Sequence, residues 1–581
     1  MFSRVGKNIP NIAKRYFGVS NSNPKRYFTN NSPNKPVYAK VTNKAECYHG
    51  NGTNHAYVDG LNIFKEPINV YGGFKIDGFH FTSIEDVHNY YHVTYSYFDE
   101  GDGVGEWIRI VELPDDAEAI KEDTTFGTKW KTNELILKER YPLYDLETIK
   151  KFNIKLTPRY ISEACARGKV DILEWWKNSR IPLQYDENAM DLASKNGHTN
   201  VLDWWKNSGL ELKYSRHSLS SASENGHVNV LDWWFNSGLK LIYDETALNL
   251  ASGNGHVNVL DWWKNKNQPK NLIERFKMWK DAKKKLELKY SSEALLYASR
   301  NGHVNVLEWW KNSGLELNYY SNALNDASMN GHVNVLDWWF NSGLKLKYSE
   351  YALDFASGNG HVNVLDWWKK SGLLLEYSKL SLDRASTNGK IDVLNWWKNS
   401  GLELKFSKNA LDGASSNGHI DVLNWWKNSK FQLIYSENAL CTRYINVLEW
   451  WKNSGLEMEY SERVLDYASY SGWVEVLDWW KNSGLPLKYS ERGLNEASLF
   501  GHINVLEWWK NSGLPLKYSE EALYRIAYHS GNADALKWWK NSGLELKFYS
   551  FCFKTIEDCE KKIATNSLFQ YYAQKVRDYY I

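Results

Sequence analysis

The chain has 581 residues, with 71 basic and 69 acidic side chains, a formal net charge of +2 and as many as 30 tryptophans. This near balance argues against nucleic acid as the partner, since proteins that bind the phosphate backbone usually have a clearly basic surface. Five cysteines without CxxC spacing fit neither a disulfide nor a zinc framework, so we expect free thiols in a reducing compartment. No stretch approaches the roughly 18 consecutive apolar residues of a membrane-spanning helix.

The chain begins with a basic segment. Residues 1–40 contain eight Lys or Arg and no acidic residue. This composition favours a flexible, solvated tail over 1–36. The alternative is a mitochondrial targeting segment within 1–40.

The tryptophans belong to an internal repeat. The dipeptide Trp-Trp occurs thirteen times, mostly 29 residues apart. An insertion over 266–285 and a four-residue deletion near 441–444 interrupt the spacing. A fixed period of this length predicts a solenoid of stacked units over 151–548. The pairs begin at Trp175, Trp204, Trp233, Trp262, Trp309, Trp338, Trp367, Trp396, Trp425, Trp450, Trp479, Trp508 and Trp538.

One unit, 348–377, shows the expected helix pair. Ser349 is a good N-cap for a first helix, and Asn359-Gly360 ends it because glycine accepts the left-handed C′ conformation. The second helix runs from about 362 to 371, and its apolar residues cover an arc of roughly 160°. A helix this apolar must be covered on two sides, so we expect both tryptophans of each pair in the core. These apolar residues are Val364, Leu365, Trp367 and Trp368.

The repeat resembles the ankyrin repeat. Ala352-Leu353-Asp354-Phe355-Ala356-Ser357, followed by Asn-Gly-His and Val-x-Val-Leu-x-Trp-Trp, is similar to the ankyrin pattern TPLHxAAxxGHxxVVxxLL, and the first unit has Thr157-Pro158. The period of 29 residues is shorter than the ankyrin period of about 33. The resemblance implies a mostly α, ankyrin-like solenoid of about 13 helix-turn-helix repeats that binds proteins.

Residues 37–150 show a second resemblance, carried by Lys40-Val41-Thr42-Asn43, Tyr57-Val58-Asp59-Gly60-Leu61-Asn62, Gly78-Phe79-His80-Phe81-Thr82 and the stretch Lys129 to Leu137. They are similar to the N-terminal domain that precedes ankyrin arrays in giant viruses of amoebae, the mimivirus type. We expect a small α+β domain here and a C-terminal helical cap over 549–581. The resemblance implies a viral protein that engages a host protein in the host cytoplasm.

Comparison of the repeats with one another predicts where a partner binds. Two positions of the first helix vary, while the Ala, Leu, Gly and Trp-Trp positions recur. Both variable positions point away from the apolar stripe. The second helical position provides His217, Thr246, Tyr351, Leu380, Arg463 and Arg492, and the ninth provides Lys195, Glu224, Arg300, Met329, Thr387, Tyr470 and Leu499.

No residues indicate catalysis. GxSxG, HExxH and phosphate-loop motifs are missing, and the Gly-His histidines recur once per repeat, too far apart to share a metal. We therefore expect a non-catalytic, monomeric scaffold without cofactor, metal or membrane contact. Two alternatives stay open: the repeats recruit substrate for an N-terminal enzyme or ubiquitin-ligase adaptor, or the tryptophans bind glycan or single-stranded nucleic acid.

Overall fold

The computed structural model describes residues 37–44, 46–50, 53–63, 79–91, 105–115, 117, 119–124, 127–267, 286–530, 532–549 and 554–563. The predicted tail over 1–36 and most of the insertion over 266–285 lie outside these ranges. The described residues form two compact units. The first contains those up to 193 together with 200–214, and the second contains 194–199 together with those from 215 onward.

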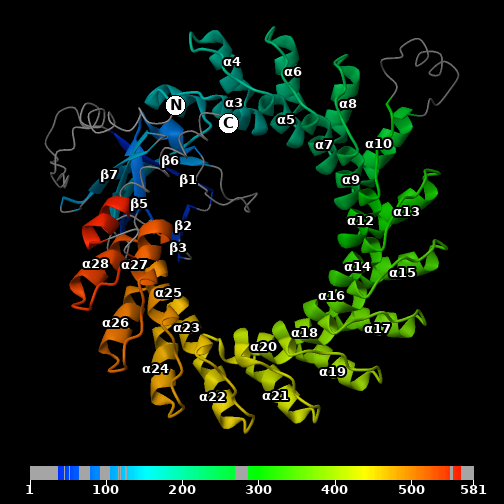
Figure 1. Ribbon diagram of the computed structural model, residues 1–581. Helices are drawn as coiled ribbons and strands as arrows, with labels where there is room; N and C mark the ends of the chain where they lie inside the picture. Colours follow the sequence, from blue (N-terminus) through cyan, green and yellow to red (C-terminus); the bar gives the residue numbers. More distant parts are fainter. Residues whose placement is uncertain are drawn as a thin grey trace, which may run out of the picture. The chain divides into compact units, whose positions relative to one another are not determined.

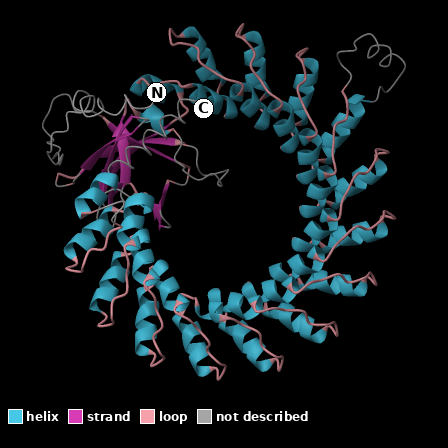
Figure 2. Ribbon diagram, viewed as in Figure 1, coloured by secondary structure: helices cyan, strands magenta, loops and turns pink. Residues whose placement is uncertain are grey.

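The first unit is built on an antiparallel sheet of seven strands in the order β4-β9-β6-β1-β5-β8-β7, and β2 pairs with β3 in a separate hairpin. Figure 2 shows the strands of this unit in magenta. The 3-10 helix η1 (Val87–Tyr90) follows β5. The strands are β1 (Tyr38–Thr42), β2 (Cys47–Gly50), β3 (Thr53–Ala56), β4 (Gly60–Ile63), β5 (Phe79–Ser83), β6 (Trp107–Glu112), β7 (Ala119–Thr124), β8 (Gly127–Thr132) and β9 (Glu134–Pro142).

Alternation along the strands gives this sheet two different faces. Phe79 and Phe81 of β5 pack with Val111 of β6 and Leu135 and Leu137 of β9 in one apolar cluster. Because paired residues of antiparallel strands share a face, the register also places Lys40 of β1 opposite Arg109 of β6. Both are buried, at 9% and 2% exposure, so this sheet has two basic side chains in its interior, and burial lowers the pKa of Lys40 to about 7.

Helices of the first unit follow the sheet along the chain. They are α2 (Leu146–Phe152), α3 (Pro158–Ala166), α4 (Val170–Asn178), α5 (Asn188–Lys195, whose last two residues belong to the second unit) and α6 (Thr199–Asn207, whose first residue does). Thr157 caps α3 by accepting a hydrogen bond from the Tyr160 amide at 3.2 Å, and Pro158 takes the first helical position.

The second unit is a row of helix pairs, with the first helices side by side in one layer and the second helices in another (Figure 1). The first helices are α7 (His217–Glu224), α9 (Thr246–Gly253), α12 (Glu293–Arg300), α14 (Asn322–Met329), α16 (Tyr351–Asn359), α18 (Leu380–Thr387), α20 (Asn409–Ser416), the 3-10 helix η3 (Glu437–Leu440), α23 (Arg463–Tyr470), α25 (Arg492–Phe500) and α27 (Glu521–Arg525), continued by the π-helix η4 (Ile526–Ser530). The second helices are α8 (Val228–Asn236), α10 (Val257–Asn267), α13 (Val304–Asn312), α15 (Val333–Asn341), α17 (Val362–Lys370), α19 (Ile391–Asn399), α21 (Ile420–Asn428), α22 (Ile445–Asn453), α24 (Val474–Asn482), α26 (Ile503–Asn511) and α28 (Ala533–Asn541).

The predicted fold class is confirmed: the chain is mostly helical, with paired helices in ankyrin-like repeats after a domain with an antiparallel sheet. Ala352, Leu353 and Ala356 of α16 are fully buried, as are their counterparts in the other repeats. Gly360 ends α16 at φ 91°, the left-handed conformation that the sequence predicted. The predicted serine caps accept a hydrogen bond from the backbone N–H two residues later. Ser378, for example, accepts one from the Leu380 amide.

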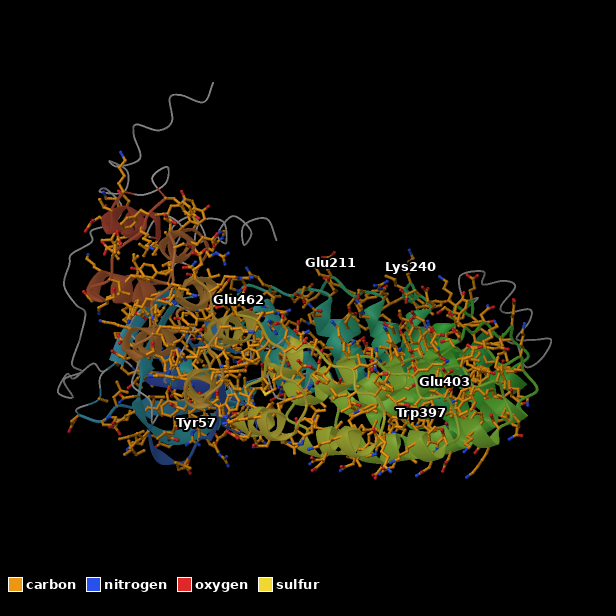
Figure 3. The ribbon with its side chains drawn as sticks, turned by 60° about the horizontal axis from the view of Figure 1, so that its bottom comes forward. Tyr57, Glu211, Lys240, Trp397, Glu403 and Glu462 are labelled. Atoms are coloured by element: carbon orange, nitrogen blue, oxygen red, sulfur yellow. The ribbon has the colours of Figure 1, made fainter. Side chains whose placement is uncertain are left out.

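The second tryptophan of each pair forms the core between repeats. Trp368 and Trp397 have no exposed surface, and Figure 3 labels Trp397 among the helices of the row. The indole N–H of Trp368 donates to the hydroxyl of Ser328 in the preceding first helix at 3.0 Å. In the second unit ten such bonds, 2.8 to 3.1 Å long, make a Trp-Ser ladder. Trp480 is the exception, because the deletion near 441–444 removes the serine of the preceding repeat.

The first tryptophan of each pair lies differently from the prediction. Trp367 is partly exposed, and its indole N–H donates to the carboxylate of Asp337 in the preceding second helix at 2.6 Å. In the same way, the indole N–H of Trp338 donates to Glu308 and that of Trp396 donates to Asp366. The expectation that both rings are core residues is confirmed for the pairs of Trp262 and Trp538, where the first ring is buried too, and was wrong for the first ring of the other pairs, because the neighbouring repeat covers only one side of the second helix.

A second buried contact joins successive first helices. Asp412 of α20 is 6% exposed, and its carboxylate accepts hydrogen bonds from the Ser436 amide at 2.8 Å and hydroxyl at 2.5 Å. The side-chain amide of Asn325 makes the equivalent pair of bonds to Ser349: its oxygen accepts from the Ser349 backbone N–H, and its nitrogen donates to the Ser349 hydroxyl. Burial raises the pKa of Asp412, and Asp383 and Asp466 share this direction and cause.

We expect Asp412→Asn to be at least as stable as the wild type at neutral pH, whereas Asp412→Ala loses about 1–3 kcal/mol because the Ser436 amide has no partner. A folded-state pKa above the ordinary 3.8 means that the folded chain binds the proton more tightly. Wild-type stability relative to Asp412→Asn therefore rises as the pH falls through the raised pKa toward 3.8. Urea unfolding of the three proteins between neutral and acidic pH measures this. An Asn variant as unstable as the Ala variant would contradict it.

Beyond the last repeat, residues 556–563 form a helix within the predicted cap. Ile556 and Cys559 are buried, and Lys540 of α28 forms an ion pair with Glu560 at 2.9 Å.

Among the thiols that the structure describes, burial raises the pKa of Cys165 to about 12 and that of Cys441 to about 11, and both are free. Within the described ranges, no helix has the length and apolar character needed to cross a bilayer.

Candidate protein-binding surface

The thirteen predicted partner-binding residues all lie in the second unit, on the side of the first helices away from the apolar stripe. None is buried. His217, Tyr351, Arg463, Arg492, Lys195, Arg300 and Tyr470 are exposed, and Thr246, Leu380, Glu224, Met329, Thr387 and Leu499 are partly exposed. Their role in binding remains a prediction, but their positions allow it.

The structure adds a third row to this surface. The sixth position of the first helix lies between the two predicted rows and is at least partly exposed in each repeat that has a full first helix. Its residues vary as much as the predicted ones, so the same comparison among repeats could have found them. In the second unit they are Ser221, Leu250, Tyr297, Asp326, Phe355, Arg384, Gly413, Tyr467 and Glu496.

Contacts across neighbouring helices make these rows one continuous surface. Arg300 of α12 forms an ion pair with Asp326 of α14 at 2.7 Å. The Arg384 guanidinium of α18 lies 4.6 Å from the ring centroid of Phe355 in α16. Each contact joins one repeat to the next, so a partner would meet a surface that is organised in advance.

One part of this surface is unusually aromatic. Tyr467 and Tyr470 of α23 and Phe500 of α25 are 38%, 41% and 47% exposed. The Tyr470 and Phe500 rings are 4.7 Å apart, and the Trp473 ring lies 5.6 Å from that of Tyr467. Neighbouring exposed aromatic rings are typical of the centres of protein interfaces. We call these four residues the aromatic patch.

The Gly-His histidines are structural contacts between repeats. The His502 imidazole bonds the Tyr470 carbonyl at 3.0 Å, and the His361 ring bonds the carbonyl of Met329. Burial lowers the pKa of His361, which favours the neutral ring. Across the described ranges no three His, Cys, Asp or Glu side chains are placed to hold a metal ion.

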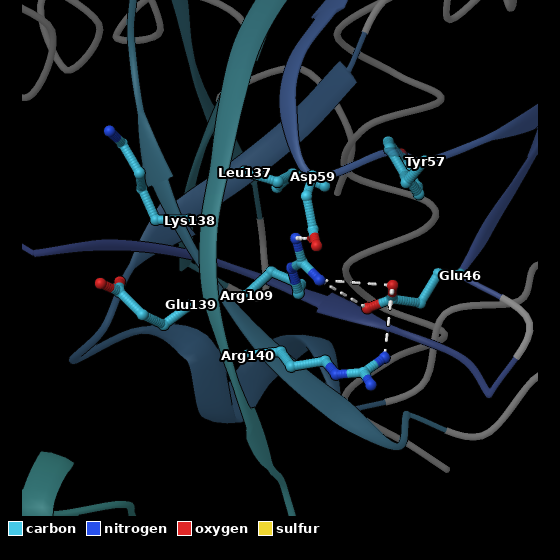
Figure 4. A pocket seen from close by; sticks show the side chains of 8 residues that line it. All are labelled: Glu46, Tyr57, Asp59, Arg109, Leu137, Lys138, Glu139 and Arg140. Atoms are coloured by element: carbon cyan, nitrogen blue, oxygen red, sulfur yellow. Dashed lines mark hydrogen bonds and ion pairs between the residues drawn. The ribbon is translucent and has the colours of Figure 1, made fainter.

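The first unit has a pocket of about 500 Å³ over β6 and β9 (Figure 4). Arg109, buried at its base, bonds Glu46 at 3.2 Å and also bonds Asp59, and Arg140 lies 3.9 Å from Glu46. The hydrogen bond from Arg109 lowers the pKa of Asp59. Since these two cations and two anions balance one another, the pocket has no surplus charge that would select a ligand.

Comparisons with known proteins add little to this geometry. No protein-family model matches the chain. Over 102 residues the chain is 37% identical to "Uncharacterized protein L696" of Acanthamoeba polyphaga mimivirus, a match that spans 17% of this chain and 30% of that protein. A crystal structure of the human ASB11 ankyrin repeat domain matches 35% of this chain and 92% of that domain, at 16% identity and a TM-score of 0.25. So loose a superposition carries no argument, and the repeat architecture rests on the helices themselves.

Proposed function

We propose that this chain is a non-catalytic scaffold of a giant virus that binds a host protein through the exposed surface of its first helices. The aromatic patch carries the proposal, because three large aromatic side chains stay 38% to 47% exposed on two adjacent helices. Exposing them to water is unfavourable unless a partner covers them. The partial match to a mimivirus protein supports a viral origin.

The test is capture of host proteins from Acanthamoeba extract by the full-length chain and by the triple variant Tyr467→Glu, Tyr470→Lys, Phe500→Asn. Each new residue already stands at the same position in another repeat, as Glu496, Lys195 and Asn359 do. The fold should therefore tolerate them. We expect the variant to lose the captured protein while its melting temperature stays unchanged.

A matched control carries three substitutions on the second helices, Lys452→Ala, Lys481→Ala and Lys510→Ala, at exposed positions of α22, α24 and α26. It should capture the same protein as the wild type. The proposal is wrong if the patch variant and the control behave alike.

The two alternative functions have less support. Binding of glycan or single-stranded nucleic acid needs open indole faces, but the second ring of each pair is buried and the first is at most partly exposed. For an enzymatic N-terminal domain, the pocket over β6 and β9 contributes only the balanced ion pairs around Arg109 among the described residues.

A further inference from the structure

The loops that follow the second helices share a cation site. In seven repeats the residue before the last aromatic residue of the loop is a lysine, and its ammonium lies 4.5 to 5.1 Å from the ring centroid of the preceding repeat's tyrosine. An ammonium at this distance from the ring centroid makes a cation–π contact. The pairs are Lys213 with Tyr185, Lys289 with Tyr243, Lys347 with Tyr319, Lys405 with Tyr377, Lys488 with Tyr460, Lys517 with Tyr489 and Lys547 with Tyr518.

Tyr319 shows how the site is built. Its ring contacts the buried Trp339, with the ring centroids 4.8 Å apart. The Lys347 ammonium lies 4.6 Å from the Tyr319 ring and donates to the Tyr319 carbonyl at 2.8 Å. The tyrosine ring and its own carbonyl thus form a ready-made receptor for an ammonium group, which the next repeat fills.

At Tyr435 the receptor is present but the lysine is missing. The Tyr435 ring contacts Trp451 at 4.8 Å, as in the other repeats. Glu459 stands where the lysine would be, and Glu457 precedes it by two residues. Among the described residues neither carboxylate forms an ion pair. Burial, followed by the charges of Glu457 and Glu459, raises the pKa of Tyr435.

These residues line a pocket of about 730 Å³, together with Tyr460 and Glu437. Glu437 is already engaged, because its carboxylate accepts hydrogen bonds from the Ser461 amide and hydroxyl and lies 3.8 Å from the Arg463 guanidinium. Four other rings lack the lysine, and none of them has acidic residues both at the lysine position and two residues before it. The residues at the lysine position of these four sites are Ile242, Asn318, Glu376 and Ile434. The Tyr435 pocket therefore combines an aromatic ring with two carboxylates, Glu457 and Glu459, that form no ion pair with the described residues.

We propose that the Tyr435 pocket binds a lysine or arginine side chain from a basic segment of the partner protein. The partner supplies the cation that the next repeat supplies elsewhere in the chain. A pocket of this volume also has room for the neighbouring residues of a peptide. This inference rests on the proposed binding function and names the chemistry of the partner at a second site.

The experiment measures the fluorescence anisotropy of a labelled hexalysine peptide with the full-length chain at low ionic strength. The decisive variant is Glu459→Lys, which restores the lysine found in seven repeats and fills the receptor from within. We expect it to bind the peptide at least about tenfold more weakly. Its melting temperature should be unchanged or higher, because the new lysine makes a contact that the fold already uses.

The matched control is Glu376→Lys, which makes the same charge change at the same exposed position of another loop, next to Tyr348. It should keep hexalysine affinity within about twofold. The inference is overturned if the wild type does not bind the peptide, if Glu459→Lys binds it unchanged, or if both variants weaken binding equally. The patch variant should still bind hexalysine, so failure of this inference and failure of the proposed function give different results.

Discussion

Replacing Trp368 by alanine is expected to lower the free energy of unfolding of the surrounding repeats by about 3–5 kcal/mol. The side chain has no exposed surface, and its ring packs against Tyr348 with the centroids 4.7 Å apart. Truncation leaves a cavity between two repeats. It also removes the indole N–H that donates a hydrogen bond to the Ser328 hydroxyl. The surrounding helices can close such a cavity only in part, so most of the burial energy is lost.

Trp367→Ala is the matched control, since it removes the same side chain from the neighbouring position. Its ring is partly exposed and its hydrogen bond goes to the surface carboxylate of Asp337, so we expect a loss below about 2 kcal/mol. Each repeat contacts mainly its neighbours, so hydrogen exchange over α14 to α18 should report the difference best. Equal losses in the two variants would mean that the second tryptophan does not form the core.

Gly331→Ala is expected to cost more than Gly343→Ala, although both glycines have a left-handed backbone, with φ of 81° and 75°. A left-handed conformation alone costs an alanine about 1–2 kcal/mol. A Cβ on Gly331 would lie 2.8 Å from Nδ1 of His361, whereas a Cβ on Gly343 meets nothing within 4 Å. Gly331→Ala must therefore also displace the His361 ring from its bond to the Met329 carbonyl.

We expect Gly343→Ala to lose about 1–2 kcal/mol and Gly331→Ala at least about 1 kcal/mol more. Urea unfolding measures both, and hydrogen exchange at the start of α17 should increase only in Gly331→Ala. If the two variants lose the same stability, the contact between glycine and histidine contributes nothing and only the backbone conformation matters.

Much of the candidate surface could be predicted from the sequence. The variable second and ninth positions are at least partly exposed, because they lie on the side of the first helix away from the buried Ala and Leu positions. The Tyr435 pocket could not be predicted in the same way. In five of the seven filled sites the lysine and the tyrosine stand 28 residues apart, as Lys347 and Tyr319 do, and in the other two they stand further apart, so only stacking of the repeats brings them together.

By itself the sequence determined the repeat, the two helices of each unit and the glycines that end them, because these depend on local spacing and backbone conformation. Only the tertiary structure decided which tryptophan of a pair is buried, since both lie on the apolar arc and the neighbouring repeat covers one of them. The tertiary structure also decided that Asp412 is a buried contact and not a surface charge. Its partner, Ser436, belongs to the next repeat, and a buried carboxylate is stable there only because that serine provides two hydrogen bonds.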